Sequence, residues 1–123
     1  MAVFLVLQAA RFGDVVQTGR LLQGLAARGQ VHLAVDENLV ALARLLYPFA
    51  RIHGLCLHGR DEQGFLLKNT RVLEQWRHEH FSAVYNCNFS GLTAALCRIF
   101  EPEQVQGFRP APGGIWRSPW ARV

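Results

Sequence analysis

Cysteine is scarce in this sequence, and its cysteines are not paired. There are three, Cys56, Cys87 and Cys97, with no close pair, and an odd, widely spaced set is not a disulfide framework. We therefore expect reduced thiols buried in a cytosolic protein. Long hydrophobic runs are missing as well: the apolar stretch 1–7 is too short to span a membrane and has neither a basic leader nor a cleavage pattern. These absences predict a soluble, cytoplasmic chain.

The motifs of several enzyme classes are also missing. The turn after the first expected strand has a single glycine, Gly13, whereas dinucleotide binding needs three in G-x-G-x-x-G spacing. Asp36, after the second strand, is therefore interpreted as a helix cap and not as a ribose ligand. No serine lies in the G-x-S-x-G arrangement of a hydrolase. The histidines and cysteines lack the tight, repeated pairs typical of zinc sites, so we expect no resident cofactor and no metal.

Lysine is almost absent, so the basic charge is carried by arginine. There are 12 arginines and one lysine, Lys68, and the formal net charge is +4. A guanidinium binds phosphates and carboxylates in two-point geometry. The excess is modest and spread along the chain, which does not indicate a nucleic-acid partner. It favours an anionic small ligand or a lipid head group.

Strand-like and helix-like segments alternate along the 123 residues. Half of the residues are hydrophobic and 18% are charged, which is typical of one globular domain. Apolar runs predict strands, and helical periodicity predicts the helices between them. The expected strands are residues 3–7, 31–35, 51–57, 81–85 and 104–106, and the expected helices include residues 15–25, 38–46 and 90–99. This alternation predicts an α/β, Rossmann-like open parallel sheet of about five strands with helices on both faces.

Polar and glycine residues indicate where these elements begin and end. Gly29 stands where a helix C-cap glycine belongs, and Asp36 can cap the helix that follows it. A polar, glycine-bearing stretch at residues 58–64 predicts a surface loop. A further helix is expected to begin at Asn69 or Thr70. Its apolar stripe would consist of Leu73, Trp76 and His80.

The last residues differ in composition from the rest. Residues 108–123 contain three prolines, two adjacent glycines and the tryptophans Trp116 and Trp120. Proline and glycine oppose regular structure, whereas tryptophan favours burial. We therefore expect a domain at residues 1–107 and an irregular tail at residues 108–123, either draped over that domain or docked on a partner.

The sharpest candidate site is Gly13–Asp14, in the turn after the first strand. Ligands of open α/β sheets bind at the carboxyl edge of the strands, and a glycine there allows close approach or positive φ. Asp14 has two compatible interpretations. It can be a helix N-cap that complements the helix dipole, or an ionised general base that takes a proton from an attacking hydroxyl.

Further polar side chains are expected near the same edge. Asn86 and Ser90, past the fourth strand, can bind hydroxyl groups or serve as turn and cap residues. Arg60, Lys68 and Arg71 flank the loop after the third strand. Solvated surface charge is the usual role of such residues, but a basic loop at this edge would suit a phosphorylated acceptor.

The turn and the strand order together resemble the N-terminal half of glycosyltransferase family 9, the heptosyltransferase-like enzymes. The resemblance rests on the strand at residues 5–8, the turn Arg11-Phe12-Gly13-Asp14-Val15-Val16-Gln17-Thr18, the strands at 31–35 and near Ile52, the segment 81–86 and the strand-to-glycine step at 105–107. The turn is moderately specific, and the other matches gain weight from their order. The chain departs from the family at Gly19-Arg20, where members often have a proline.

This resemblance implies an inverting transfer of a heptose from a nucleotide-sugar, such as ADP-heptose, to a lipopolysaccharide-like acceptor. It makes Asp14 the general base. The implied substrate-binding residues are Gly13, Arg11, Thr18, Asn86, Ser90, Arg60, Lys68 and Arg71. The family's second, nucleotide-sugar-binding domain has no counterpart in these residues, so we expect the chain alone to catalyse nothing without a donor domain or a partner chain. The location implied is the cytoplasm, including the inner face of the inner membrane.

A non-catalytic role stays open beside this one. The chain would then be an α/β binding or interaction module that self-associates or docks on a partner. Trp116 and Trp120, in the segment 108–123, would make that contact.

Overall fold

Five parallel strands and one antiparallel strand form a single sheet in the computed structural model, which describes residues 2–9, 11–57, 62–87, 100, 102–111 and 114–117. The strands of this described part are β1 (Ala2–Leu7), β2 (Gly29–Asp36), β3 (Arg51–Leu55), β4 (Ala83–Asn86), β5 (Val105–Ala111) and β6 (Gly114–Arg117). Their spatial order is β3-β2-β1-β4-β5-β6, and only the β5–β6 pair is antiparallel. The predicted Rossmann-like α/β sheet is confirmed, with β6 as an additional strand.

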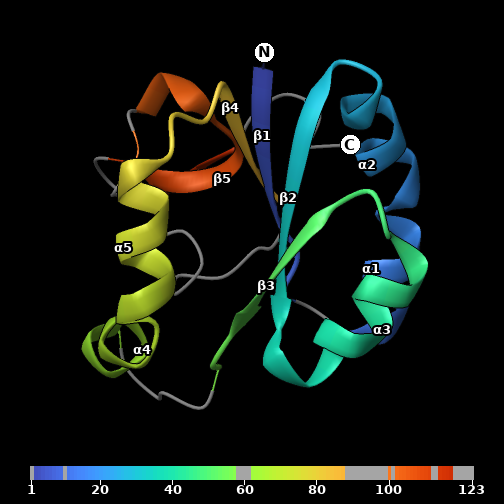
Figure 1. The fold of residues 1–123 in the computed structure, drawn as a ribbon. Coiled ribbons are helices and arrows are strands. Elements are labelled where there is room, and N and C mark those ends of the chain that lie inside the picture. The colour runs from blue at the N-terminus through green and yellow to red at the C-terminus, as the bar shows by residue number, and fades with distance from the viewer. Residues whose placement is uncertain are drawn as a thin grey trace.

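Helices cover both faces of this sheet, as predicted (Figure 1). One face carries α1 (Phe12–Gln17), α2 (Gly19–Ala26) and α3 (Val40–Leu46), and the other carries α4 (Glu62–Lys68) and α5 (Thr70–His78). Two short 3₁₀ helices lie at Glu37–Leu39 and Pro102–Gln104. Among the described residues, no helix combines the length and the apolar content needed to cross a bilayer.

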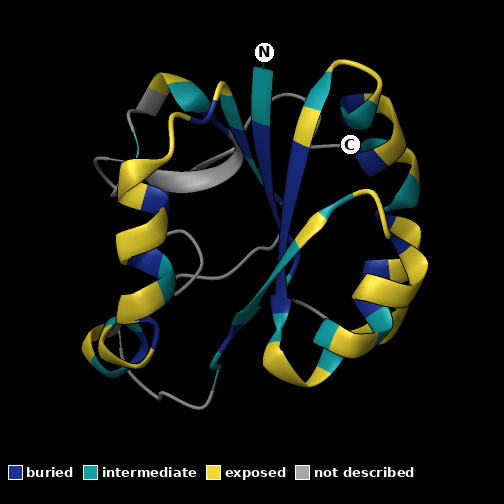
Figure 2. Ribbon diagram, viewed as in Figure 1, coloured by how far each residue is buried: buried dark blue, intermediate teal, exposed yellow. Residues whose placement is uncertain are grey.

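The central strand β1 is buried on both faces because its side chains alternate between two hydrophobic clusters. Leu5 and Leu7 pack with the buried side chains of α4 and α5, among them Trp76. Phe4 and Val6 pack with the buried side chains of α1, α2 and α3. Figure 2 shows the buried strands between helices whose outer faces are exposed. The continuous apolar run at the start of the sequence is therefore explained by burial from two sides.

Gly29 does not cap a helix, so this expectation is wrong. Helix α2 ends at Ala26 with Ala27 at its C-cap, and Gly29 is the first residue of β2. It lies in register with Ala2 of β1, and a Cβ added to Gly29 would overlap the carbonyl group of Ala2. The glycine is required by the close approach of two strands.

Three other elements differ from the expectations. The helix expected at residues 15–25 is divided into α1 and α2 at Thr18. Helix α4 lies partly within the expected loop 58–64, and Phe65, directly after that stretch, holds it against the core, where it is fully buried. His80 is exposed beyond the end of α5, so it is not part of the apolar stripe.

The segment expected to be irregular, residues 108–123, includes the end of β5 and all of β6. The two strands pair antiparallel from Phe108↔Arg117 to Ala111↔Gly114, so the expectation is wrong for these residues. The predicted boundary at residue 107 stays a prediction. Trp120 and the helix expected at residues 90–99 lie outside the described residues.

Asp36 was expected to cap the helix that follows it, and it caps the 3₁₀ helix Glu37–Leu39, which leads into α3. The Asp36 carboxylate accepts a hydrogen bond from the backbone N–H of Asn38 at 2.9 Å.

A further helix was expected to begin at Asn69 or Thr70, and this is confirmed, because α5 begins at Thr70 with Asn69 at its N-cap position. The Asn69 side chain makes no cap bond. Its oxygen accepts from the Cys56 backbone N–H at 2.7 Å, and its amide nitrogen donates to the carbonyl oxygens of Cys56 at 2.9 Å and Phe65 at 2.8 Å. The Asn69 side chain thus pairs with both backbone groups of Cys56, directly after β3, in the manner of a neighbouring strand.

A pair of histidines lies within the core between the sheet and α5. The Nδ1 atom of His32 and the Nε2 atom of His53 are 2.9 Å apart, and the two rings stack with centroids separated by 5.2 Å. The ring of His32 makes an edge-to-face contact with Phe81, and the ring of His53 makes one with Trp76. Burial, the neighbouring His32 and the Arg51 charge lower the pKa of His53 to about 4.

The pKa of His32 is lowered as well. Burial is the main cause of the lower pKa. The nearby Glu79 carboxylate raises the pKa and the Arg51 guanidinium lowers it further, each by a smaller amount than burial. Both imidazoles are therefore neutral at pH 7, which allows one ring to donate the shared hydrogen bond and the other to accept it.

The close approach at Gly29 can be tested by substitution. Gly29→Ala places a methyl group against the backbone of β1, so we expect the free energy of unfolding to fall by about 2–3 kcal/mol in urea denaturation. The matched control is Gly24→Ala in the middle of α2, where an added Cβ meets open space. It should stabilise the protein by about 0.5–1 kcal/mol. Equal effects of the two substitutions would contradict the role assigned to Gly29.

The histidine pair predicts a loss of stability in acid. Because the unfolded chain binds protons near pH 6.5 and folded His53 only near pH 4, the free energy of unfolding should decrease as the pH falls between these values. The contribution of His53 to this slope is at most about 1.4 kcal/mol per pH unit, and its partial exposure lowers that figure. Replacing His53 by Gln keeps a hydrogen-bonding amide beside His32 without titrating, so the slope should become shallower.

Urea unfolding at several pH values between 4 and 7 measures this slope. The exposed His78→Gln variant, at the end of α5, is the matched control. The same pH dependence in both variants would show that the buried pair does not cause the acid destabilisation.

Candidate functional site

The carboxyl ends of the central strands meet at one edge of the sheet, where α1 begins after β1. Leu7 of β1 lies in register with Ala34 of β2 and with Asn86 of β4. The backbone pairing continues one residue further on each side, because Gln8 N–H donates to the Ala34 carbonyl at 2.9 Å and Cys87 N–H donates to the Leu7 carbonyl at 3.0 Å. This is the edge at which open α/β sheets bind their ligands, and it holds the predicted Gly13–Asp14 turn.

Asp14 is exposed in the first turn of α1, and it is not the N-cap. The N-cap position belongs to Arg11, whose side chain makes no capping bond and is exposed. The Asp14 backbone N–H donates to the Arg11 carbonyl at 3.0 Å. Its carboxylate forms no hydrogen bond or ion pair with any residue that the structure describes, and its charge complements the N-terminal end of the helix dipole. The carboxylate is therefore accessible to a ligand at this edge.

Gly13 adopts helical backbone geometry, so the positive φ that a glycine permits is not used here. A Cβ added at Gly13 would meet no atom within 4 Å. The fold therefore does not require glycine at this position, in contrast to Gly29. Because Gly13 has no side chain, the surface beside Asp14 is open. A glycine at this position is therefore best explained by close approach of a ligand.

Thr18 is buried and joins the end of β1 to the end of α1. Its hydroxyl donates to the Asp14 carbonyl oxygen at 2.7 Å and accepts from the Gln8 side-chain amide at 3.1 Å. Thr18, predicted to bind substrate, is thus engaged inside the protein and positions the turn. Gln8 was not predicted as part of the site. The sequence pattern that could have identified Gln8 is a polar residue directly after an apolar strand. In the structure the Gln8 side chain is buried.

Tyr47 fixes the other end of α1. Its hydroxyl donates to the carbonyl oxygens of Val15 at 2.6 Å and Val16 at 3.0 Å, in the last turn of this short helix. Burial raises the pKa of Tyr47, which keeps this hydroxyl a donor. Thr18 and Tyr47 together hold α1 and its first-turn carboxylate in one orientation.

Asn86 and Cys87 complete the edge at the end of β4. Asn86 is fully buried, so the structure places its side chain beneath the edge and not on its surface. Burial raises the pKa of the Cys87 thiol to about 11. The thiol is therefore protonated at neutral pH and is not a nucleophile.

The remaining predicted site residues lie apart from this group. Lys68 and Arg71 are exposed on α4 and α5, across the sheet from α1 (Figure 1). Arg60 and Ser90 fall outside the described residues. In the part of the chain that the structure describes, no three metal-ligating side chains of His, Cys, Asp or Glu gather. The structure thus brings together Arg11, Gly13, Asp14, Thr18 and Asn86 at the carboxyl edge.

Comparison with known proteins gives a likeness of fold. No family model matches the chain, and no curated protein matches its sequence. Among solved structures, the glycosyl transferase family 9 protein from Veillonella parvula DSM 2008 is similar, with a TM-score of 0.68 and 16% sequence identity over 86% of this chain. The chain spans 31% of the length of that protein. The described sheet and helices therefore have the fold of part of a glycosyltransferase.

Proposed function

We propose that this chain is the acceptor-side part of a glycosyltransferase resembling family 9, with Asp14 as the general base. The observation that carries the proposal is the exposed Asp14 carboxylate, at the carboxyl edge of the central strand and without a hydrogen-bonding partner among the described residues. The similar fold of a known glycosyltransferase supports the same conclusion. The internal bonds of Thr18 and Tyr47 hold the turn that presents this carboxylate.

In the proposed reaction an acceptor hydroxyl attacks the anomeric carbon of a nucleotide-sugar. The bond between that carbon and the nucleotide's phosphate oxygen breaks with inversion, and the hydroxyl proton passes to the Asp14 carboxylate as the new bond forms. The carboxylate contributes by its position beside the acceptor. The donor half would come from a further domain or a partner chain, since the chain spans a minor part of the similar enzyme.

The finer assignments belong to the same proposal. The donor is a heptose-type nucleotide-sugar such as ADP-heptose, and the acceptor is a lipopolysaccharide-like glycan. Arg11 and Gly13 would contact the acceptor, and Arg60, Lys68, Arg71 and Ser90 would hold its phosphate and hydroxyl groups. An enzyme with such an acceptor would act at the inner face of the inner membrane.

Asp14→Asn tests the proposed base. Transfer from ADP-heptose to a lipopolysaccharide-core acceptor should fall by about 100-fold or more in kcat, because the amide cannot take the proton. The assay uses the protein that combines this chain with its donor half. Asp36→Asn is the matched control at the end of the neighbouring strand β2, where an amide oxygen can still cap the helix. If Asp14→Asn keeps its activity, Asp14 is not the base; a loss confined to Asp36→Asn would point to a different ligand site.

Gly13→Ala separates ligand approach from folding. An added Cβ meets open space in a helix, so we expect the free energy of unfolding to rise by a few tenths to about 1 kcal/mol. The same methyl group narrows the surface beside Asp14, so transfer should fall by about tenfold or more. The comparison variant is Gly24→Ala in α2, which gains stability in the same way and should transfer normally. Full activity of Gly13→Ala would show that no ligand approaches the backbone there.

A further inference from the structure

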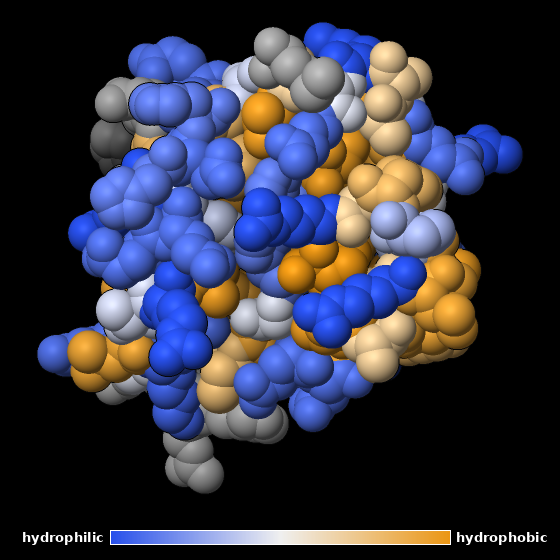
Figure 3. Space-filling model, viewed as in Figure 1, coloured by the Kyte–Doolittle hydropathy of each residue, from blue (hydrophilic) through white to orange (hydrophobic). Residues whose placement is uncertain are grey.

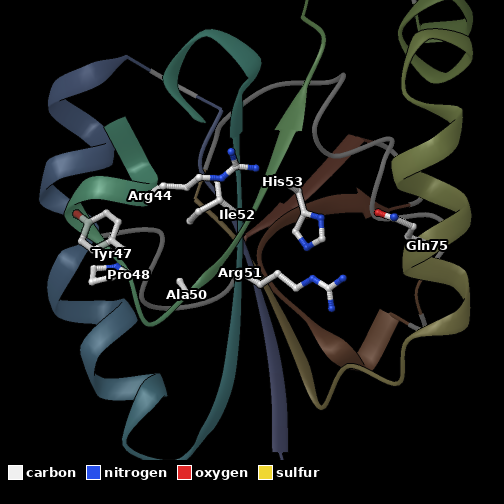
Figure 4. A pocket seen from close by; sticks show the side chains of 8 residues that line it. All are labelled: Arg44, Tyr47, Pro48, Ala50, Arg51, Ile52, His53 and Gln75. Atoms are coloured by element: carbon white, nitrogen blue, oxygen red, sulfur yellow. The ribbon is translucent and has the colours of Figure 1, made fainter. Parts of the chain in front are cut away.

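A groove of about 600 Å³ lies along the outer edge of β3, away from the carboxyl edge of the sheet. Its walls come from the end of α3, the first residues of β3 and one side chain of α5, Gln75 (Figure 4). Arg51 of this groove is in register with His32, at the amino-terminal end of the strand. Asp14, by contrast, follows the carboxyl end of β1. The groove is therefore separate from the candidate site.

The groove carries two guanidinium groups that form no ion pair with an acidic side chain of the described residues. Arg44 reaches it from α3 and Arg51 from β3, and both are exposed. Neither forms an ion pair or a hydrogen bond with a residue that the structure describes, whereas Arg77 on α5 is 3.5 Å from Glu74. None of the residues lining the groove is acidic. Figure 4 shows Arg44 on the α3 side of β3 and Arg51 on the α5 side, and Figure 3 shows hydrophilic side chains among hydrophobic ones at the centre of this face.

The uncharged groups of the groove add hydrogen-bond donors. The Nε2 atom of His53 is engaged by His32, which leaves Nδ1. The Nε2 atom of His32 is buried and has no hydrogen-bond partner among the described residues. The arrangement that buries no unpaired N–H therefore places the His32 proton on Nδ1 and the His53 proton on its own Nδ1. The Gln75 amide lies across the groove from β3 (Figure 4). The opposite wall, Tyr47 and Pro48, offers a ring face to an uncharged part of a ligand.

These features define the chemistry of the ligand. Two unpaired guanidinium groups, an imidazole N–H and an amide require several acceptor oxygens with more than one negative charge, and a tetrahedral phosphoryl group meets this need better than a single carboxylate. A volume of about 600 Å³ suits a ligand of sugar-phosphate or nucleotide size. We propose that the groove at the outer edge of β3 binds the phosphoryl group of a small phosphorylated ligand through Arg44 and Arg51.

The test is a titration of the full chain with inorganic pyrophosphate, followed by ¹⁵N NMR. We expect saturable shifts at Arg51, His53 and Gln75. The variants Arg44→Gln and Arg51→Gln should each weaken binding by about tenfold or more, since each removes a two-point, charge-assisted contact. Arg77→Gln carries the same change of net charge at a residue already close to Glu74, so it should bind pyrophosphate normally.

Three results would overturn the proposal. They are the lack of saturable binding, binding that both groove variants retain, and an equal loss in all three variants, which would reflect net charge alone. Malonate binding as tightly as pyrophosphate would overturn the choice of a phosphoryl group. Because Arg44 and Arg51 are exposed and form no hydrogen bond or ion pair with the described residues, circular dichroism should show that the variants fold.

Two further probes identify the source of the phosphoryl group. Vesicles containing phosphatidylglycerol that bind the protein and lose this binding in Arg44→Gln would assign it to a lipid head group. Binding of glucose 1-phosphate without binding to such vesicles would assign it to a soluble metabolite. Both results support the groove, and neither depends on transfer activity, so the groove and the role of Asp14 can fail independently.

Discussion

Burial of β1 on both faces is the constraint on which the rest of the structure depends. A strand covered from two sides must be apolar at every position, must be paired along both edges and must be flanked by helices on each face. Leu5 and Leu7 require α4 and α5, while Phe4 and Val6 require the helices α1 to α3. The same constraint places the start of α1 at the carboxyl edge, because the chain can leave β1 only at its end. The Asp14 carboxylate owes its position to this requirement.

The parts of the fold that depend on local pattern could be predicted from the sequence. The apolar runs indicated the strands β1 to β4 and the parallel α/β class, because a strand buried on both faces has its own composition. The parts that depend on distant contacts could not. Gly29 is needed because of Ala2, which is far away in the sequence. Phe65 stabilises α4 directly after a stretch that is polar and glycine-bearing, and its contacts in the core are with residues far away in the sequence.

The candidate site shows the same division. The strand, turn and helix predicted that Gly13 and Asp14 would lie at the carboxyl edge. The bonds that fix them could not be predicted, since Thr18 and Tyr47 act through backbone carbonyl groups, which every residue possesses. The β3 groove was invisible for a different reason. Arg44, Arg51 and Gln75 are unremarkable surface residues in the sequence, and only the packing of α3 and α5 beside the edge strand brings them together.

The Asn69 side chain has a consequence for self-assembly. A terminal β-strand displays backbone donors and acceptors that can recruit a strand from another molecule and so start aggregation. Asn69 presents one donor and one acceptor to the backbone of Cys56, in the manner of a strand. These two backbone groups, directly after β3, are therefore not available to an incoming strand. At the start of β3, the exposed and charged Arg51 opposes close pairing with another chain. One amide side chain and one guanidinium thus make this part of the sheet a poorer template for a strand of another molecule.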